Sequence, residues 1–196
     1  MFRRTAFLAA LLVALTATTA SAATTTITIT SLHYPPKTTI GIGDTVTWQN
    51  QMQPSTHHTS TSNTPLSLWS FYMNGNGTSG SKVFSAAGTF AYHCEIHPTE
   101  MHGNIAVQMK AVPTSGTTTT SFWIRWATAR APAGFKYMVQ RKAPGGSFAA
   151  FKSTVDSGAE WTPSKAGTWS FRSKLRRLSN GSASGYSPTL TVTVTH

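Results

Sequence analysis

The chain has 196 residues, with 16 basic and 5 acidic side chains, a formal net charge of +11 and a single cysteine. One cysteine excludes an internal disulfide. The few carboxylates and the absence of Ser-His-Asp and zinc-hydrolase patterns exclude the common hydrolytic sites, so we expect a protein that is not an enzyme.

The N-terminal segment 1–22 has the pattern of a secretory signal peptide. Arg3 and Arg4 precede an apolar run over residues 6–15, and residues 20–22, Ala-Ser-Ala, offer a cleavage site. The apolar run is too short to span a bilayer as a helix, and no cysteine near the cleavage point could carry a lipid. We expect a soluble mature protein that is secreted or periplasmic, and either free or associated with the cell wall.

Alternating apolar and polar residues predict an all-β first half of the mature chain. Glycine and proline supply the turns, and the glycine-rich segment 74–80 is predicted to be a flexible loop. The predicted strands cover residues 26–30, 45–48, 83–84, 89–94 and 104–109.

Segment 90–103, FAYHCEIHPTEMHG, carries the most specific chemistry of the chain. Cys94 is followed by His97 and then by Met101. A thiolate, an imidazole and a thioether are soft donors, which suit copper better than the cations that prefer oxygen. A strand would deliver Cys94 to the rim of a barrel, and the next loop would wrap the other donors around one point. Side chains of a strand alternate, so His93 must point away from that metal.

A trigonal copper site of this kind needs a second histidine. A short loop cannot surround a metal on all sides, so this donor should come from a distant part of the chain. Segment 53–62, QPSTHHTSTS, offers two candidates, His57 and His58.

Residues 26–108 together resemble a small blue copper protein, a cupredoxin of the plastocyanin and amicyanin kind. The resemblance rests on Tyr34-Pro35, the segments 43–50, 58–61 and 90–98, and the Met-His-Gly-Asn-Ile ending at 101–105. It implies a Greek-key β-barrel over residues 23–111 that holds one copper ion in a type 1 site. The implied ligands are His58, Cys94, His97 and Met101.

Two details qualify the ligand set. The resemblance favours His58 over His57, because the family ligand is usually followed by Thr or Asn and a β-branched strand. Three residues separate His97 from Met101, whereas amicyanin-like loops have two and plastocyanin-like loops have four. The chain lacks the second cysteine of a binuclear purple-copper site and the His-x-His pairs of multicopper oxidases.

Residues 112–116 are predicted to be a linker, because the stretch VPTSGTTTT that begins there has no periodicity. Residues 117–196 then resemble a fibronectin type III domain, an immunoglobulin-like β-sandwich. The resemblance rests on Trp126, on segments 137–140, 167–172 and 185–188, and on predicted strands at 122–126, 135–142, 168–175 and 189–193. Trp169 stands where the family's corner tyrosine is expected.

The excess positive charge lies in this second domain. Residues 23–110 carry three basic and three acidic side chains, whereas residues from 111 onward carry eleven basic and two acidic ones. If the fibronectin topology holds, two adjacent strands turn five basic side chains to solvent: Lys136, Lys142, Arg172, Lys174 and Arg176. Such a face suggests an anionic cell-wall polymer, a phospholipid surface or an acidic redox protein as partner, and no nucleic acid is expected.

The sequence therefore predicts an exported type 1 copper protein that carries single electrons to or from an unknown redox partner, with a basic module for attachment. One alternative is a copper-delivery protein in which the same ligands hold the metal as cargo. Another is an adhesion protein whose copper site is vestigial.

Overall fold

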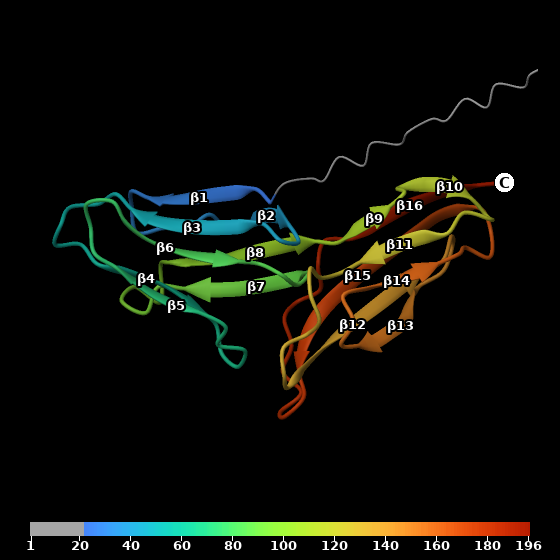
Figure 1. Cartoon of the computed structure of the whole chain (residues 1–196). Helices are drawn as coiled ribbons and strands as arrows, with labels where there is room; N and C mark the ends of the chain where they lie inside the picture. Colours follow the sequence, from blue (N-terminus) through green and yellow to red (C-terminus); the bar gives the residue numbers. More distant parts are fainter. Residues whose placement is uncertain (1–21) are drawn as a thin grey trace, which may run out of the picture.

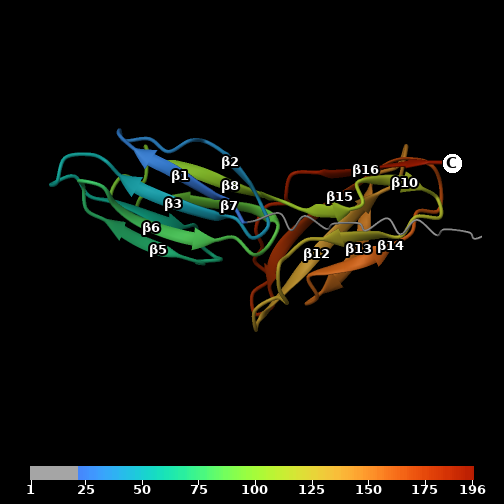
Figure 2. The ribbon, with the colours of Figure 1, turned by 45° about the horizontal axis from the view of Figure 1, so that its top comes forward.

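A computed structural model describes residues 22–196, and it is all-β over this range. The predicted signal peptide, apart from Ala22, lies outside the described residues. Within them, no helix is long and apolar enough to cross a membrane. Two β-sandwiches lie end to end along the molecule (Figures 1 and 2).

The first sandwich packs a three-stranded sheet on a five-stranded sheet. The smaller sheet has the order β1-β3-β6, with β1 parallel to β3, and the larger has the order β2-β8-β7-β4-β5. This all-β arrangement matches the predicted cupredoxin Greek-key class. The strands are β1 Thr24–Ile29, β2 Thr38–Gly41, β3 Thr45–Asn50, β4 His58–Ser62, β5 Ser70–Met73, β6 Thr78–Val83, β7 Gly88–His93 and β8 His102–Gln108.

The core of this sandwich follows from side-chain alternation along the strands. In β3, Val46 and Trp48 are buried, while Thr45 and Thr47, which alternate with them, are partly exposed. The Trp48 ring stacks on Trp69 at 5.7 Å and meets the edge of Tyr92 at 5.4 Å. This aromatic layer gives the small sandwich a rigid interior without a disulfide.

The glycine-rich segment 74–80 differs from the predicted loop, because its last three residues belong to β6. Asn76 and Gly77 adopt positive φ angles of 63° and 85°, which make the turn tight enough for β6 to start at once. Position 80 of β6 is occupied by glycine because a Cβ atom there would lie 2.5 Å from the Phe71 ring. Gly80 therefore allows close packing between strands and does not indicate a flexible loop.

The second sandwich has the same plan, with a three-stranded sheet of order β14-β11-β9 and a five-stranded sheet of order β10-β16-β15-β12-β13. It is an immunoglobulin-like sandwich, as predicted. The Trp169 indole donates to the carbonyl oxygen of Lys165 at 3.0 Å, four residues upstream. The strands are β9 Lys110–Val112, β10 Ser115–Thr117, β11 Phe122–Arg125, β12 Phe135–Lys142, β13 Phe148–Thr154, β14 Gly158–Trp161, β15 Gly167–Arg177 and β16 Leu190–Thr195.

The predicted linker 112–116 is not a free connection. Val112 ends β9, which pairs with β11, and Ser115 and Gly116 belong to β10, which pairs with β16. Composition missed these short edge strands because three residues are too few to show a period. The second sandwich therefore begins at Lys110, directly after β8.

Backbone hydrogen bonds join the two sandwiches. Thr89 at the start of β7 exchanges both backbone bonds with Gly185 at 2.9 Å, and the Ala87 amide donates to the Trp126 carbonyl at 2.8 Å. Buried side chains of both sandwiches form one continuous apolar cluster. The second sandwich thus covers one end of the first and leaves the opposite end free (Figure 1).

Candidate metal centre

The free end of the first sandwich brings one residue of β4 and two residues of the loop after β7 together. His58 is the first residue of β4, and its side chain is fully buried. Cys94 follows the last residue of β7 and is also fully buried. His97 lies in the loop between β7 and β8 and is partly exposed.

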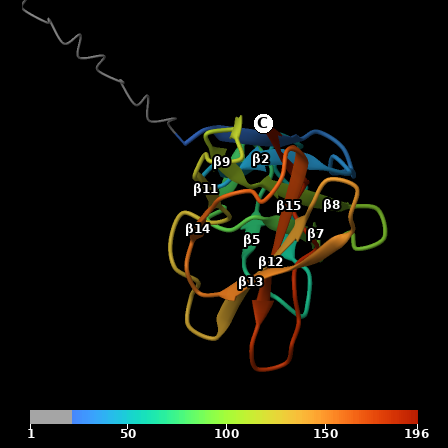
Figure 3. The ribbon, with the colours of Figure 1, turned by 90° about the vertical axis from the view of Figure 1, so that its right-hand side faces the viewer.

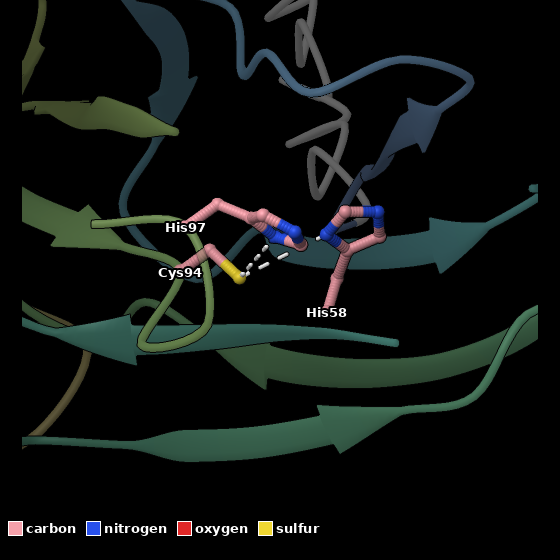
Figure 4. Close-up of side chains that lie close together, drawn as sticks. All are labelled: His58, Cys94 and His97. Atoms are coloured by element: carbon pink, nitrogen blue, oxygen red, sulfur yellow. Dashed lines mark hydrogen bonds between the residues drawn. The ribbon is translucent and has the colours of Figure 1, made fainter. Parts of the chain in front are cut away.

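Donor atoms of His58, Cys94 and His97 all lie within 4.8 Å of one another. Cys94 Sγ is 3.8 Å from Nδ1 of His58 and 3.6 Å from Nδ1 of His97, and both rings turn toward the sulfur (Figure 4). Metal–sulfur and metal–imidazole bonds of about 2.3 and 2.05 Å at a trigonal angle of about 120° would separate the two donor atoms by about 3.8 Å. Both sulfur–nitrogen distances therefore match those expected around one metal ion.

Backbone hydrogen bonds hold this loop in shape. The Cys94 amide donates to the Met101 carbonyl at 2.9 Å, and the Met101 amide donates to the His97 carbonyl at 3.0 Å. These bonds close the loop on itself and set the direction of the His97 ring. The Met101 side chain is fully buried in the apolar cluster that also contains Cys94.

Thr59 attaches the loop to β4. Its amide donates to Cys94 Sγ at 3.2 Å, and its hydroxyl oxygen accepts from the Glu95 amide at 2.8 Å. The Tyr34 hydroxyl donates to the Thr59 carbonyl. Burial, with a smaller contribution from Cys94, raises the pKa of Tyr34 above its usual range, so this donor stays protonated. Thr59 is thus held from both sides while it donates to the sulfur.

Met52 is a residue of this site that the sequence did not single out. Its Sδ atom lies 3.1 Å from Nε2 of His58. A thioether only accepts a hydrogen bond, so the contact places the imidazole proton on Nε2 and leaves the Nδ1 lone pair for a metal. Burial, followed by the nearby His97 and His57 rings, lowers the pKa of His58, which also favours the neutral ligand form.

The other histidines lie outside the cluster. His57 stacks on Tyr72 with ring centroids 5.6 Å apart, so the structure places His58 rather than His57 at the sulfur. Nδ1 of His93 lies 2.7 Å from Oδ1 of Asn63, on the side of β7 away from the Cys94 sulfur. His33 and His102 are exposed.

No protein-family model and no curated protein matches the sequence. A purple cupredoxin from Nitrosopumilus maritimus is 29% identical over 38% of this chain and 79% of that one, with a TM-score of 0.34. Domains 3 and 4 of rat CD4 are 10% identical over 87% of this chain and 100% of that one, with a TM-score of 0.33. The multicopper oxidase mgLAC is 13% identical over 81% and 76% of the two chains, with a TM-score of 0.26.

TM-scores this low do not assign the chain to a family, so the class of the centre is defined by its own atoms. Fold and site together define a two-sandwich β-protein with a candidate centre for one soft transition-metal ion. One cysteine sulfur and two imidazole nitrogens are a donor set that suits copper.

Proposed function

We propose that the protein is an exported type 1 copper protein that carries single electrons and has no enzymatic activity. The observation that supports this most directly is the trio of one sulfur and two Nδ1 atoms within 4.8 Å. His58, Cys94 and His97 would hold the ion, and Met101 would be the weak axial donor. When bound, copper would supply a one-electron couple.

The surroundings of the donors favour electron transfer over copper delivery. A metal carried as cargo must exchange readily with a partner. Here His58, Cys94 and Met101 are fully buried, and His97 is the one proposed ligand with partial exposure. Hydrogen bonds from Thr59 and within the loop hold the donors in place, which would keep reorganisation small between oxidation states. The exposed edge of His97 is the proposed route for the electron.

Export is proposed from the signal-peptide pattern of residues 1–22. An oxidising compartment makes a free thiol a liability, and ligation would protect Cys94 there. The redox partner would meet the free end of the first sandwich, which the second sandwich leaves accessible (Figure 1).

The visible spectrum of the purified protein loaded with Cu(II) tests the proposal. We expect an intense band from thiolate-to-copper charge transfer. Cys94→Ser should abolish the band, and His58→Ala or His97→Ala should weaken or reshape it. His57→Ala is the matched control and should leave it nearly intact.

A protein that binds copper without this band, or whose band depends on His57 and not on His58, would contradict the proposed centre. Cycles of reduction and reoxidation distinguish electron transfer from copper delivery. An electron carrier should complete several cycles without losing copper, whereas a delivery protein should release Cu(I) to a chelator once it is reduced.

A further inference from the structure

The outer side of the second sandwich presents an unbalanced positive surface. Strands β12 and β15 are antiparallel neighbours, and their buried residues alternate with partly exposed ones. Lys136 lies directly opposite Arg176, and Lys174 lies opposite Met138. We call this surface the basic face; it contains Lys136, Lys142, Arg172, Lys174 and Arg176. Figure 3 shows β12 and β15, the two strands that carry it, at the near end of the molecule, with β13 beside β12.

No acidic side chain neutralises the basic face. From residue 111 onward the chain has two carboxylates, Asp156 and Glu160. Asp156 lies in the turn after β13 and pairs with Arg130 at 3.8 Å, and Glu160 lies on β14 of the opposite sheet. Like charges directly across a strand pair destabilise a sheet. Lys136 lies opposite Arg176, whose Nε donates to the Gly181 carbonyl oxygen at 3.3 Å, and an anion from outside the chain would offset the remaining repulsion.

Aromatic rings and an amide hold the central cation in place. The Arg172 guanidinium lies between two rings, 4.0 Å from the centroid of Phe148 and 4.1 Å from that of Tyr186. Its Nε donates to Oε1 of Gln140 at 2.8 Å. The Lys174 ammonium lies 4.8 Å from the centroid of the Tyr186 ring. These contacts order a cation that would otherwise be mobile, which lowers the entropy lost on binding.

A hollow of about 140 Å³ lies beside these cations. A volume of this order has room for several waters or for one charged substituent of a larger ligand. Its walls combine a phenol, an amide, a hydroxyl and an ammonium group. The lining includes Met138, Gln140, Lys152, Ser153 and Tyr186.

We infer that the basic face binds a linear polysaccharide that carries carboxylate or sulfate groups. Guanidinium and ammonium groups bind these anions, and Arg172 can do so with two parallel hydrogen bonds. The hydroxyl, amide and ring surfaces of the hollow suit the hydroxyl groups and apolar edges of sugars. Arg172, Lys174 and Arg176 alternate along β15 with a spacing of about 7 Å, so a chain with repeated charges meets several cations at once.

A phospholipid surface fits this face less well than a polysaccharide. Binding to a membrane interface generally combines basic side chains with apolar ones that insert between the lipids. The exposed large apolar side chains of residues 22–196 are Leu32, Tyr72, Val83, Ile96, Val112, Trp123 and Leu178; none of them lies on β12, β13, β15 or β16, and Leu178 alone directly follows one of these strands, at the end of β15.

Calorimetry on the whole exported chain tests the inference, with heparin and polygalacturonate as probes and uncharged dextran as reference. Both acidic polymers should bind and dextran should not, and the affinity should fall steeply with added salt. The triple reversal Arg172→Glu, Lys174→Glu and Arg176→Glu should weaken binding at least about tenfold. The matched control reverses three exposed lysines elsewhere, Lys37, Lys110 and Lys165, and should weaken binding less than about twofold.

The reversal of Arg172 also removes its packing against two rings, so a milder variant keeps the test independent of folding. Lys136→Gln, Lys174→Gln and Arg176→Gln together leave Arg172 in place and should still weaken binding severalfold. Equal losses in the control and in the face variants would show a response to net charge alone and overturn the inference. Tighter binding to anionic vesicles or to a single-stranded oligonucleotide than to either polysaccharide would overturn it as well. The copper spectrum should be the same in every variant, so failure here is distinguishable from failure of the proposed function.

Discussion

At the scale of single residues, the candidate centre depends on how each donor is oriented by a neighbour. The Thr59 amide donates a hydrogen bond to the Cys94 sulfur, and the Met52 sulfur accepts one from His58. A neighbouring residue therefore orients both Cys94 and His58. Such neighbours set the tautomer and the basicity of a metal ligand, and they act on the metal without touching it.

Met101 is the proposed axial ligand, and its spacing from His97 is unusual, so its replacement tests whether it is bound. Met101→Leu should keep the visible band and raise the reduction potential, because loss of a weak donor destabilises Cu(II) more than Cu(I). Met101→Gln should lower the potential, because an amide oxygen favours Cu(II). Protein-film voltammetry measures both values, and an unchanged potential in the two variants would show that Met101 is not a ligand.

Met52 should tune the centre through His58. Met52→Gln offers a stronger acceptor to Nε2, which raises the basicity of the imidazole and should lower the reduction potential. In the metal-free protein, nitrogen NMR should find the His58 proton on Nε2 in both the parent and this variant. Met52→Leu removes the acceptor and should cost about 1 kcal/mol of stability, because a buried N–H group loses its partner. Met109→Leu is the control, since Met109 is a buried thioether that lies beyond β8, away from the centre.

At the scale of elements, the short strands β9 and β10 decide where the second domain begins. Ala111 of β9 is buried and pairs with Ile124 of β11, and Gly116 of β10 pairs with Val194. A boundary drawn from composition at residue 117 cuts off both edge strands and exposes the partners of each.

Truncation tests this boundary. A fragment of residues 110–196 should unfold cooperatively, whereas a fragment of residues 117–196 should melt roughly 5–15 °C lower, because several backbone hydrogen bonds of about 1 kcal/mol each are lost. Thermal unfolding followed by circular dichroism compares the two fragments. Equal melting temperatures would mean that β9 and β10 add nothing to the domain.

At the scale of the whole molecule, the candidate metal centre and the basic face lie at separate places on the protein. The junction residue Thr89 and the proposed ligand Cys94 stand near opposite ends of β7, about 17 Å apart at the usual rise of a strand. A partner could therefore meet His97 while the basic face is occupied.

The backbone bonds between Thr89 and Gly185 predict that the two sandwiches tumble together. Nitrogen relaxation should give one rotational correlation time for both halves of the chain. Gly185→Val should loosen the junction, because a Cβ at this glycine would already stand 3.1 Å from Cβ of Thr89. Two clearly different correlation times in the parent protein would mean that the junction is flexible in solution.

The sequence by itself determined the parts of this protein that depend on neighbours along the chain. Cys94, His97 and Met101 lie in one short loop, so their spacing alone indicated a soft metal site. Alternation along 135–142 and 168–175 predicted which basic side chains turn outward, and the structure has these strands side by side as β12 and β15. The three-residue edge strands were not predicted, because a periodic pattern needs more residues. The place of Gly80 in β6 was not predicted either, because it depends on packing against the Phe71 ring of another strand.

Only the tertiary structure decided what depends on residues far apart in the sequence. His57 and His58 are equivalent as isolated donors and only the resemblance favoured His58, whereas the structure places His58 at the sulfur and stacks His57 on Tyr72. Met52 joins the centre because the turn after β3 folds back over His58. The Arg172 guanidinium is ordered because the Phe148 and Tyr186 rings approach it from separate segments of the chain. A local sequence pattern cannot predict such a contact.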